Sequence, residues 1–370
     1  MLAKVWIQNF RNINQLNVVK QNKYIFFIGK NNQGKTTILE AIYILLTGGW
    51  LKEKDRNALI QFSKERAVIG GEWQLNEEEQ KQVYLSLSKS EGVSVVINKQ
   101  CSRDKKTFTK NCFTDYLSSD INRQFQDSAA QRRHFLDTFC TQYFTEYRQS
   151  LNRFQSVCKQ KNAWIKQDVV DQKHGDILNK QLAILSGSVL EYRIEGLRRL
   201  SEFFKKTQEI FFVDILENIQ FKYMFHRLDI EEFSRPLYQE VLFNKLQEDK
   251  QKERFLGYSL VGPHRDDFDA ISHDQSVFRF FSKGINRVFA VLTKLAHWDL
   301  VSEKFQQPLI LLLDDIFAEL DSEVKTKLAT YLKKYDQLFL TGVNSEDIGL
   351  FNDIDVYQVE KGKIHCYEAA

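Results

Sequence analysis

The feature that most constrains the fold is an octapeptide near the N-terminus. Residues 29–36 read GKNNQGKT and fit the pattern GxxxxGK[ST] at every fixed position. A dense apolar run, Tyr24–Ile28, precedes the octapeptide, and Lys35–Leu46 follows it with helical spacing. Motif and context together predict a buried strand, a phosphate-binding loop and a helix whose N-terminus faces the phosphates. The alternative, a glycine turn before an ordinary helix, leaves this agreement unexplained.

The residue types in the loop suit the phosphates of a nucleotide. Gly29 and Gly34 permit tight turns and let phosphate oxygens approach backbone N–H groups. Lys35 places a positive charge on the β- and γ-phosphates of ATP, where the reaction occurs, and Thr36 offers a hydroxyl ligand to Mg²⁺. ATP and Mg²⁺ are therefore the expected cofactors. The predicted nucleotide-binding residues are Gly29, Lys30, Asn31, Asn32, Gln33, Gly34, Lys35, Thr36 and Thr37.

A second apolar run ends in two carboxylates. Leu309–Leu313 is followed by Asp314 and Asp315. A buried parallel strand carries its ligands at its C-terminal end, so Asp314 is placed to hold Mg²⁺. Asp315 would then face the γ-phosphate and orient or deprotonate a water. Two aspartates that cap the next segment are the alternative, and pairing with the phosphate-binding loop favours the catalytic interpretation.

Periodicity places these motifs in an α/β chain. Strands are expected at Ala3–Gln8, Ala67–Trp73, Gln82–Leu87, Val93–Ile97, Ile219–Phe225, Gly257–Val261 and Gln337–Leu340. The three strands within 67–97 are expected to form an antiparallel β subdomain. Helical spacing covers 129–166, 177–204, 230–254, Ile285–Lys304 and Ser322–Lys334. The β-α-β-α rhythm of the last third predicts a mostly parallel sheet shared with the N-terminal third. The expected domains are 1–115 plus 256–370, a split head, and 116–255, an inserted helical lobe.

Composition adds limits rather than a function. Net charge is only +3, from 52 basic and 49 acidic side chains, so any DNA contact needs a local patch. The five cysteines, an odd number without CxxC spacing, are typical of reduced thiols in a cytosolic protein. With no signal sequence and no apolar run near 20 residues, the expectation is a cytoplasmic protein without a membrane partner.

The long separation of Lys35 from Asp314 implies a large insertion between the sheet halves, and it resembles the ABC and SMC head architecture. Such heads set a Ser-containing loop against the γ-phosphate bound by the other subunit. By order in the chain, Ser282 is similar to that donor, and Gly284 would let the backbone approach. An ordinary Ser N-cap for helix Ile285–Lys304 is the alternative, and on the residues alone it fits at least as well.

Further stretches along most of the chain resemble the RecF family. The most diagnostic is GPHRDD at 262–267. Two segments depart from the family pattern. Residues 282–287 read SKGINR where the family has SQGQQR, and residues 113–117 read FTDYL where the family has FxPEDL. The segment Leu340–Asn344, which follows the last core strand, contains no histidine, so no switch histidine is assigned. The other matching stretches are Asn9–Asn12, Leu39–Tyr43, Arg56, Leu59–Ile60, Gly70, Arg132–Asp137, Gln160–Asn162, Asp314–Asp315 and Glu319–Asp321.

The resemblance implies an ATP-dependent recombination mediator. Members form a homodimer on ATP, bind double-stranded DNA and single-strand/double-strand junctions at gaps, and work with RecR and RecO to load RecA in gap repair, replication restart and SOS induction. Their hydrolysis is weak, stimulated by DNA, and releases the protein. Candidate phosphate contacts, each of which could equally be a solvated or ion-paired charge, are Lys4, Arg11, Arg56, Arg103, Lys105, Lys106, Arg132 and Arg133.

Two other classes remain open at this point. A kinase for a nucleotide or small molecule would share the phosphate-binding loop, but its two motifs usually lie much closer together. An SMC-like structural ATPase would need a long coiled-coil arm. No heptad pattern continues through three or four repeats of the middle region.

Overall fold

The structure is a computed structural model that describes residues 1–51, 55–74, 80–102, 112–167, 171–211 and 218–367. The chain divides into two compact units. Unit 1 comprises Met1–Asp120 and Phe305–Ala370, and unit 2 comprises Ile121–Lys304. The first predicted domain limit, near 115, lies close to the division at Asp120. The second, at 255/256, lies within unit 2, so the predicted domains stay a proposal.

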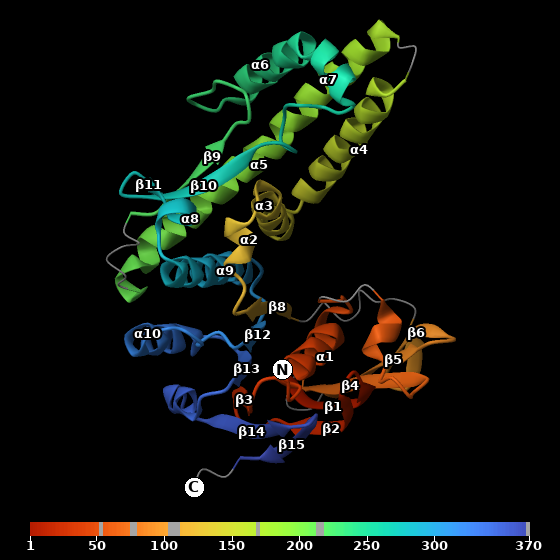
Figure 1. The fold of residues 1–370 in the computed structure, drawn as a ribbon, viewed down its shortest axis with the longest axis vertical. Helices are drawn as coiled ribbons and strands as arrows, with labels where there is room; N and C mark the ends of the chain where they lie inside the picture. The colour runs from red at the N-terminus through yellow and green to blue at the C-terminus, as the bar shows by residue number, and fades with distance from the viewer. Residues whose placement is uncertain (52–54, 75–79, 103–111, 168–170, 212–217, 368–370) are drawn as a thin grey trace. The chain divides into compact units, whose positions relative to one another are not determined.

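A mostly parallel sheet forms one layer of unit 1 (Figure 1). Its order is β15-β14-β3-β13-β12-β8, with only the β14–β15 pair antiparallel. The strands are β3 (Tyr24–Ile28), β8 (Phe113–Ser118), β12 (Leu309–Asp314), β13 (Gln337–Gly342), β14 (Ile354–Glu360) and β15 (Lys363–Cys366). Since β3 and β8 come from the N-terminal part and the other strands from the C-terminal part, the predicted shared sheet is confirmed.

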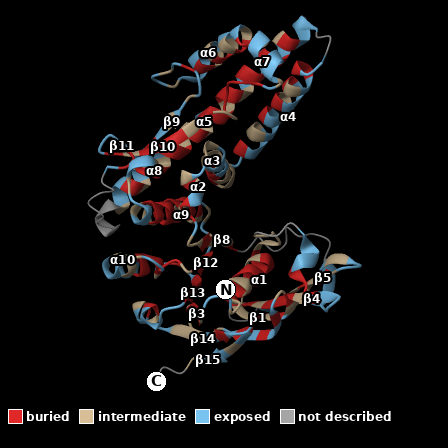
Figure 2. Ribbon diagram, viewed as in Figure 1, coloured by how far each residue is buried: buried red, intermediate tan, exposed pale blue. Residues whose placement is uncertain are grey.

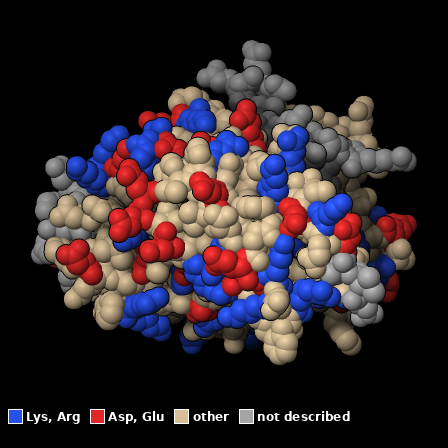
Figure 3. Space-filling view, turned by 90° about the horizontal axis from the view of Figure 1, so that it is seen from above, with Lys and Arg blue, Asp and Glu red and all other residues tan. Residues whose placement is uncertain are grey.

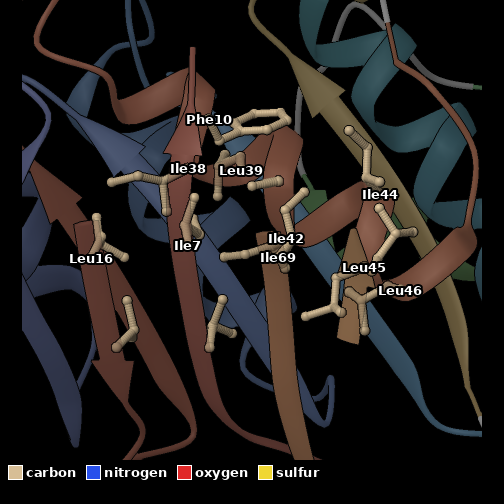
Figure 4. Packing of buried hydrophobic residues seen from close by; sticks show 14 of the residues in the cluster. Ile7, Phe10, Leu16, Ile38, Leu39, Ile42, Ile44, Leu45, Leu46 and Ile69 are labelled. Carbon is tan, nitrogen blue, oxygen red and sulfur yellow. The ribbon is translucent and has the colours of Figure 1, made fainter. Parts of the chain in front are cut away.

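The second layer of unit 1 is an antiparallel sheet with the order β2-β1-β4-β5-β6-β7. Its strands are β1 (Leu2–Phe10), β2 (Ile13–Val19), β4 (Arg66–Gln74), β5 (Gln80–Ser88), β6 (Gly92–Ile97) and β7 (Gln100–Ser102). Helix α1 (Lys35–Thr47) packs against strands of both sheets, including β4 and β12. Figure 4 shows Ile38, Leu39 and Ile42 of this helix meeting Ile7 and Ile69 of the antiparallel sheet.

Burial along the strands follows from this packing. Strands β3, β12 and β13 are buried at every residue, as expected for parallel strands covered on both faces (Figure 2). Strand β2, in contrast, alternates between exposed and buried residues from Gln15 to Val19. The Gln337 side chain joins the two sheets, because it accepts a hydrogen bond from the Leu2 N–H (2.9 Å) and donates one to the Leu2 carbonyl (2.7 Å).

Short helices complete unit 1, and unit 2 is mainly helical. Unit 1 also contains η1 (Arg56–Leu59), α10 (Ser322–Leu332) and η4 (Ser345–Leu350). The helices of unit 2 are α2 (Arg123–Gln126), α3 (Ala129–Tyr143), α4 (Tyr147–Ile165), α5 (Gln172–Phe211), α6 (Arg235–Glu248), α7 (Lys250–Leu256), α8 (Val277–Phe280) and α9 (Lys283–Phe305), whose last residue belongs to unit 1. A small antiparallel sheet has the order β11-β10-β9, formed by Gln275–Ser276, Asp267–Ser272 and Gln220–Met224.

One predicted strand, Gly257–Val261, is wrong. This segment is irregular, and the strand of this region is β10, six residues further on. Side chains take the place of strand partners: the Ser259 N–H donates to the Asn162 amide oxygen (2.8 Å) and the Leu260 N–H to the Glu253 carboxylate (2.9 Å). The predicted strand near Ile219–Phe225 is confirmed as β9.

Among the residues that the structure describes, no helix is both long enough and apolar enough to cross a bilayer.

Candidate nucleotide-binding site

The loop between β3 and α1 has the backbone that its glycines allow. Gly34 lies at φ 110°, a conformation that residues with a Cβ rarely adopt, and it immediately precedes α1. Gly29 follows β3 at a point where a Cβ atom would stand 2.4 Å from the Val359 carbonyl oxygen. Both positions therefore need glycine if the loop is to turn this tightly. The predicted strand, loop and helix around the octapeptide are confirmed.

Lys35 is folded back over the loop. Its Nζ donates hydrogen bonds to the carbonyl oxygens of Gly29 (2.7 Å) and Lys30 (3.1 Å). The side chain is 5% exposed, so its charge lies where the loop surrounds it rather than in bulk solvent. A buried ammonium held only by two carbonyls is a strong attractor for anionic oxygens.

Asp314 is the centre of a hydrogen-bond network that links three strands and α1. Thr36 Oγ1 lies 3.1 Å and 2.9 Å from its two carboxylate oxygens, 278 positions away in the chain. The Tyr116 hydroxyl donates to Asp314 Oδ2 (2.6 Å), and the Thr341 hydroxyl donates to Oδ1 (2.7 Å). Burial and the nearby Asp314 carboxylate raise the pKa of Tyr116, so this hydroxyl keeps its proton and remains a donor.

Asp315 leaves the strand in a different conformation. Its φ of 51° is left-handed, and its N–H donates to Thr341 Oγ1 (2.9 Å). Aspartate tolerates this region better than most residues. The turn lets Asp315 face the open side of the loop while Asp314 stays buried at 7% exposure.

A pocket of about 610 Å³ lies over the loop. Its lining includes most of the predicted loop residues together with Asp315, whereas Gly29, Lys30 and Asp314 are not part of the lining. Arg11 and Asn12 complete it from the β1–β2 turn. Arg11 was predicted only as a DNA contact, and it forms an ion pair with Glu40 (2.7 Å). The lining residues are Arg11, Asn12, Asn31, Asn32, Gln33, Gly34, Lys35, Thr36, Thr37 and Asp315.

The donor set beside this pocket suits magnesium. Thr36 and Asp314 supply a hydroxyl and a carboxylate within hydrogen-bond distance of each other, and both are hard oxygen ligands. Across the described ranges, no three His, Cys, Asp or Glu side chains are grouped as a metal cage. Mg²⁺ is usually bound by one or two protein oxygens plus phosphates and waters, so this open pair fits it.

The predicted Ser loop lies in unit 2. Ser282 is exposed and caps α9 weakly, because its Oγ accepts the Ile285 N–H at 3.4 Å. A Cβ at Gly284 would meet no atom within 4 Å, so this part of the loop is open. In unit 1, the Asp321 carboxylate accepts the Val324 N–H (2.9 Å), which makes it the N-cap of α10.

The GPHRDD stretch is held by buried charges inside unit 2. The fully buried Arg193 donates to the Pro263 carbonyl (2.6 Å) and pairs with Asp137 (2.8 Å). Asp266 accepts the Tyr223 hydroxyl (3.0 Å), and burial raises the pKa of its carboxyl. Arg132, a candidate DNA contact, instead pairs with Asp267 at 2.7 Å. These contacts give the stretch a structural role.

The remaining candidate DNA contacts are less informative. Lys4 Nζ lies 6.0 Å from the centre of the Trp6 ring, Arg56 is exposed, and Arg133 donates to the Asp266 carbonyl. Three others, Arg103, Lys105 and Lys106, lie outside the described residues.

Two residues that hold Asp314 were not predicted. Tyr116 and Thr341 both hold Asp314, and both lie in segments where the sequence departs from the family patterns. The departures mark the segments, but no sequence pattern says that a hydroxyl there reaches a carboxylate on a neighbouring strand.

The sequence of this chain matches a known family along nearly its whole length. The model of the RecF/RecN/SMC N-terminal domain matches residues 1–365. The chain belongs to this RecF/RecN/SMC family. Curated relatives called DNA replication and repair protein RecF support the resemblance to RecF. The protein from Ligilactobacillus salivarius is 28% identical, over 98% of this chain and 97% of its own length. The protein from Lactobacillus johnsonii is also 28% identical, with both chains fully covered.

Solved structures of the family have the same fold. The recombination mediator protein RecF, in a structure described as RecF-ATP in the RecFOR pathway, aligns with a TM-score of 0.78 at 21% identity, over 99% of both chains. An Smc head bound to the C-terminal winged-helix domain of ScpA aligns with a TM-score of 0.57 at 13% identity, over 99% of this chain and 96% of that one. The predicted fold class, an ABC/SMC-type ATPase head with an antiparallel β subdomain and an inserted helical region, is confirmed.

Proposed function

We propose that this protein is an ATP-dependent, DNA-binding recombination mediator of the RecF type. It binds ATP and Mg²⁺, dimerises on ATP, and binds double-stranded DNA and single-strand/double-strand junctions at gaps. With RecO and RecR it promotes RecA loading in gap repair, replication restart and SOS induction, and slow, DNA-stimulated hydrolysis releases it. The proposal places it in the cytoplasm. The observation that carries the proposal is the pocket in which Lys35, Thr36 and Asp315 meet beside the Asp314 network.

Each side chain of the site has a proposed task. Lys35 and the loop N–H groups bind the β- and γ-phosphates, while Thr36 and Asp314 hold Mg²⁺. Bound Mg²⁺ supplies positive charge that offsets the charge developing on the phosphate oxygens. Asp315 orients the attacking water or accepts its proton. Ser282 and Gly284 of the partner protomer close the site over the γ-phosphate.

The proposed DNA contacts are with backbone phosphates. Net charge is small, and Figure 3 shows Lys and Arg interspersed with Asp and Glu on the face in view. With so small a net charge, affinity should come from a limited set of phosphate contacts. Binding is therefore expected to be weakly selective for sequence and to weaken steeply with salt.

Gel filtration with ATP and Mg²⁺ tests the proposal. The wild type should change from monomer to dimer when both are present, and Lys35→Met should stay monomeric because the loop loses its phosphate-binding charge. Asp315→Asn serves as the matched variant in the same pocket. Asparagine keeps the shape and tolerates the left-handed backbone, so dimerisation should persist.

Hydrolysis then separates the two variants. Removal of a general base typically costs about 10²- to 10⁴-fold in rate, so Asp315→Asn should hydrolyse ATP slowly and stay on DNA longer. Loss of dimerisation together with hydrolysis in Asp315→Asn would contradict the role of that carboxylate. An oligomeric state that ignores ATP, combined with phosphorylation of a small acceptor, would favour a kinase instead.

A further inference from the structure

The Asp314 carboxylate is held from both sides of its own strand. Strand β12 lies between β8 and β13 in the parallel sheet. The Tyr116 hydroxyl reaches Oδ2 from β8, and the Thr341 hydroxyl reaches Oδ1 from β13. Each neighbouring strand therefore supplies one donor to a different oxygen of the same carboxylate.

The third donor to this carboxylate comes from a different direction. Thr36, at the start of α1, contacts both oxygens at 3.1 Å and 2.9 Å. A hydroxyl group has one hydrogen and two lone pairs, so Thr36 can donate to one Asp314 oxygen and offer a lone pair to a cation at the same time. Its single hydrogen cannot fix both carboxylate oxygens, so the donors on β8 and β13 set the orientation of the carboxylate.

Tyr116 is suited to this task by its length and its packing. It pairs with Leu312 in the β8–β12 register, two residues before Asp314. Since residues i and i+2 of a strand share a face, the Tyr116 ring points along the same side as Asp314. The ring packs against the hydrophobic core of unit 1, and its hydroxyl oxygen lies 2.6 Å from Asp314 Oδ2. A short side chain at this position would not span the same distance.

We propose that Tyr116 is a positioning residue that keeps the Asp314 carboxylate aimed at the magnesium site beside the Thr36 hydroxyl. This inference rests on the proposed function of the site. Partners that orient a metal ligand commonly change metal affinity by about 10- to 100-fold. Tyr116 is expected to act through Asp314 on Mg²⁺ and to leave the phosphate contacts of Lys35 and the loop unchanged.

Tyr116→Phe isolates this role, because it removes one oxygen and keeps the packed ring. The measurement is binding of a fluorescent, slowly hydrolysed ATP analogue, titrated with Mg²⁺ and repeated in EDTA. For Tyr116→Phe the Mg²⁺ concentration at half-maximal binding should rise by about 10-fold or more. Affinity for the analogue in EDTA should equal that of the wild type. A structural defect would instead weaken binding in both conditions.

Tyr24→Phe is the matched control. Tyr24 is a buried tyrosine of the same sheet, on β3, and its hydroxyl donates to the Lys333 carbonyl (2.8 Å) rather than to the site. Its Mg²⁺ titration should superimpose on that of the wild type, while thermal unfolding reports the loss of one buried hydrogen bond in each variant.

The outcomes separate the inference from the proposed function. A Tyr116→Phe titration identical to the wild type, or an equal loss of binding with and without Mg²⁺, would overturn the positioning role. A wild-type protein that binds the analogue with no dependence on Mg²⁺ would overturn the magnesium part of the proposed function.

Discussion

At the scale of single residues, neighbours in the chain are given different tasks by the backbone. Asp314 ends β12 inside the sheet and is fixed by three hydroxyls. Asp315 turns into the left-handed region and lines the pocket. The same pair of carboxylates can therefore supply a fixed metal ligand and a group facing the γ-phosphate, because one is buried and the other is not.

His264, in the GPHRDD stretch, shows how burial sets the charge state of a single residue. Its Nε2 lies 3.2 Å from the Ser259 carbonyl oxygen, and the centroid of its ring lies 5.9 Å from the centroid of the Phe154 ring. Burial first, and then the nearby cations Arg265, Lys161 and Arg133, lower its pKa to about 4. The folded protein therefore holds this ring neutral at physiological pH.

This lowered pKa predicts a loss of stability in acid. An unfolded histidine has a pKa of about 6.5, so between about pH 6.5 and 4 the unfolded chain binds a proton that the folded one does not. The contribution of His264 is complete above pH 6.5 and is lost as pH falls towards 4. At pH 5 linkage gives a loss of about 2 kcal/mol. His264→Gln, which stays neutral, should lack this component.

Denaturant unfolding of both proteins at pH 8 and pH 5 checks the expectation. The difference in unfolding free energy between wild type and His264→Gln should shift by about 2 kcal/mol against the wild type at the lower pH. An unchanged difference would mean that the folded ring is protonated as easily as a free histidine.

At the scale of elements, the C-terminal hairpin supports the phosphate-binding loop. At the tip of the β14–β15 turn, the Lys361 N–H donates to Gln33 Oε1 (2.8 Å) and the Gly362 N–H donates to the Gln33 carbonyl (2.9 Å). The hairpin thus holds the phosphate-binding loop at Gln33, through both the backbone and the side chain of that residue. The last part of the chain is thereby connected to a loop formed near its start.

Gly362→Ala should weaken nucleotide binding through this contact. Gly362 lies at φ 74°, and an added Cβ would stand 2.3 Å from the Asn12 carbonyl oxygen, so the tip must move. We expect ATP affinity to fall by about 3- to 10-fold, which corresponds to a loss of about 1 kcal/mol in binding free energy. Equilibrium binding of the ATP analogue measures it. Gly349→Ala, where a Cβ meets nothing within 4 Å, is the control and should bind normally.

Elements with a continuous apolar run were the easiest to predict. The bounds of β3 match the prediction, and β12 exceeds it by one residue, because strands covered on both faces are apolar throughout. The sequence pattern did not predict β2, β14 and β15, because these strands have exposed faces and a weaker apolar pattern.

The wrong strand at Gly257–Val261 and the missed contacts of Asp314 have a common cause. At Gly257–Val261 the apolar pattern of a strand is present. The backbone N–H groups of this segment, however, donate hydrogen bonds to the side chains of Asn162 and Glu253 instead of to a neighbouring strand. The Tyr116 and Thr341 contacts with Asp314 likewise depend on which strands become neighbours. Local pattern predicts an element, whereas these features arise from contacts between distant segments.

At the scale of the whole molecule, the two halves of the proposed ATP site belong to different units. Lys35 lies in unit 1 and Ser282 in unit 2. If Ser282 acts on the nucleotide of the partner protomer, a closed symmetric dimer contains two composite sites, each built from the loop of one copy and the Ser loop of the other. Defects in Asp315 and Ser282 should then complement each other when they are placed on different protomers.

A mixing experiment tests this arrangement. Asp315→Asn, which is expected to dimerise, and Ser282→Arg are each expected to lack most ATPase activity alone. In an equal mixture, about half of the dimers combine one copy of each, and one of their two sites has both an intact Asp315 and an intact Ser282. Activity should therefore recover to about a quarter of the wild-type value per protomer if sites act independently. Mixing Lys35→Met with Asp315→Asn is the matched control, because both residues lie in the same half-site, and no recovery is expected. Two inactive proteins that remain inactive after mixing, while still forming dimers with ATP, would place Ser282 outside the shared site.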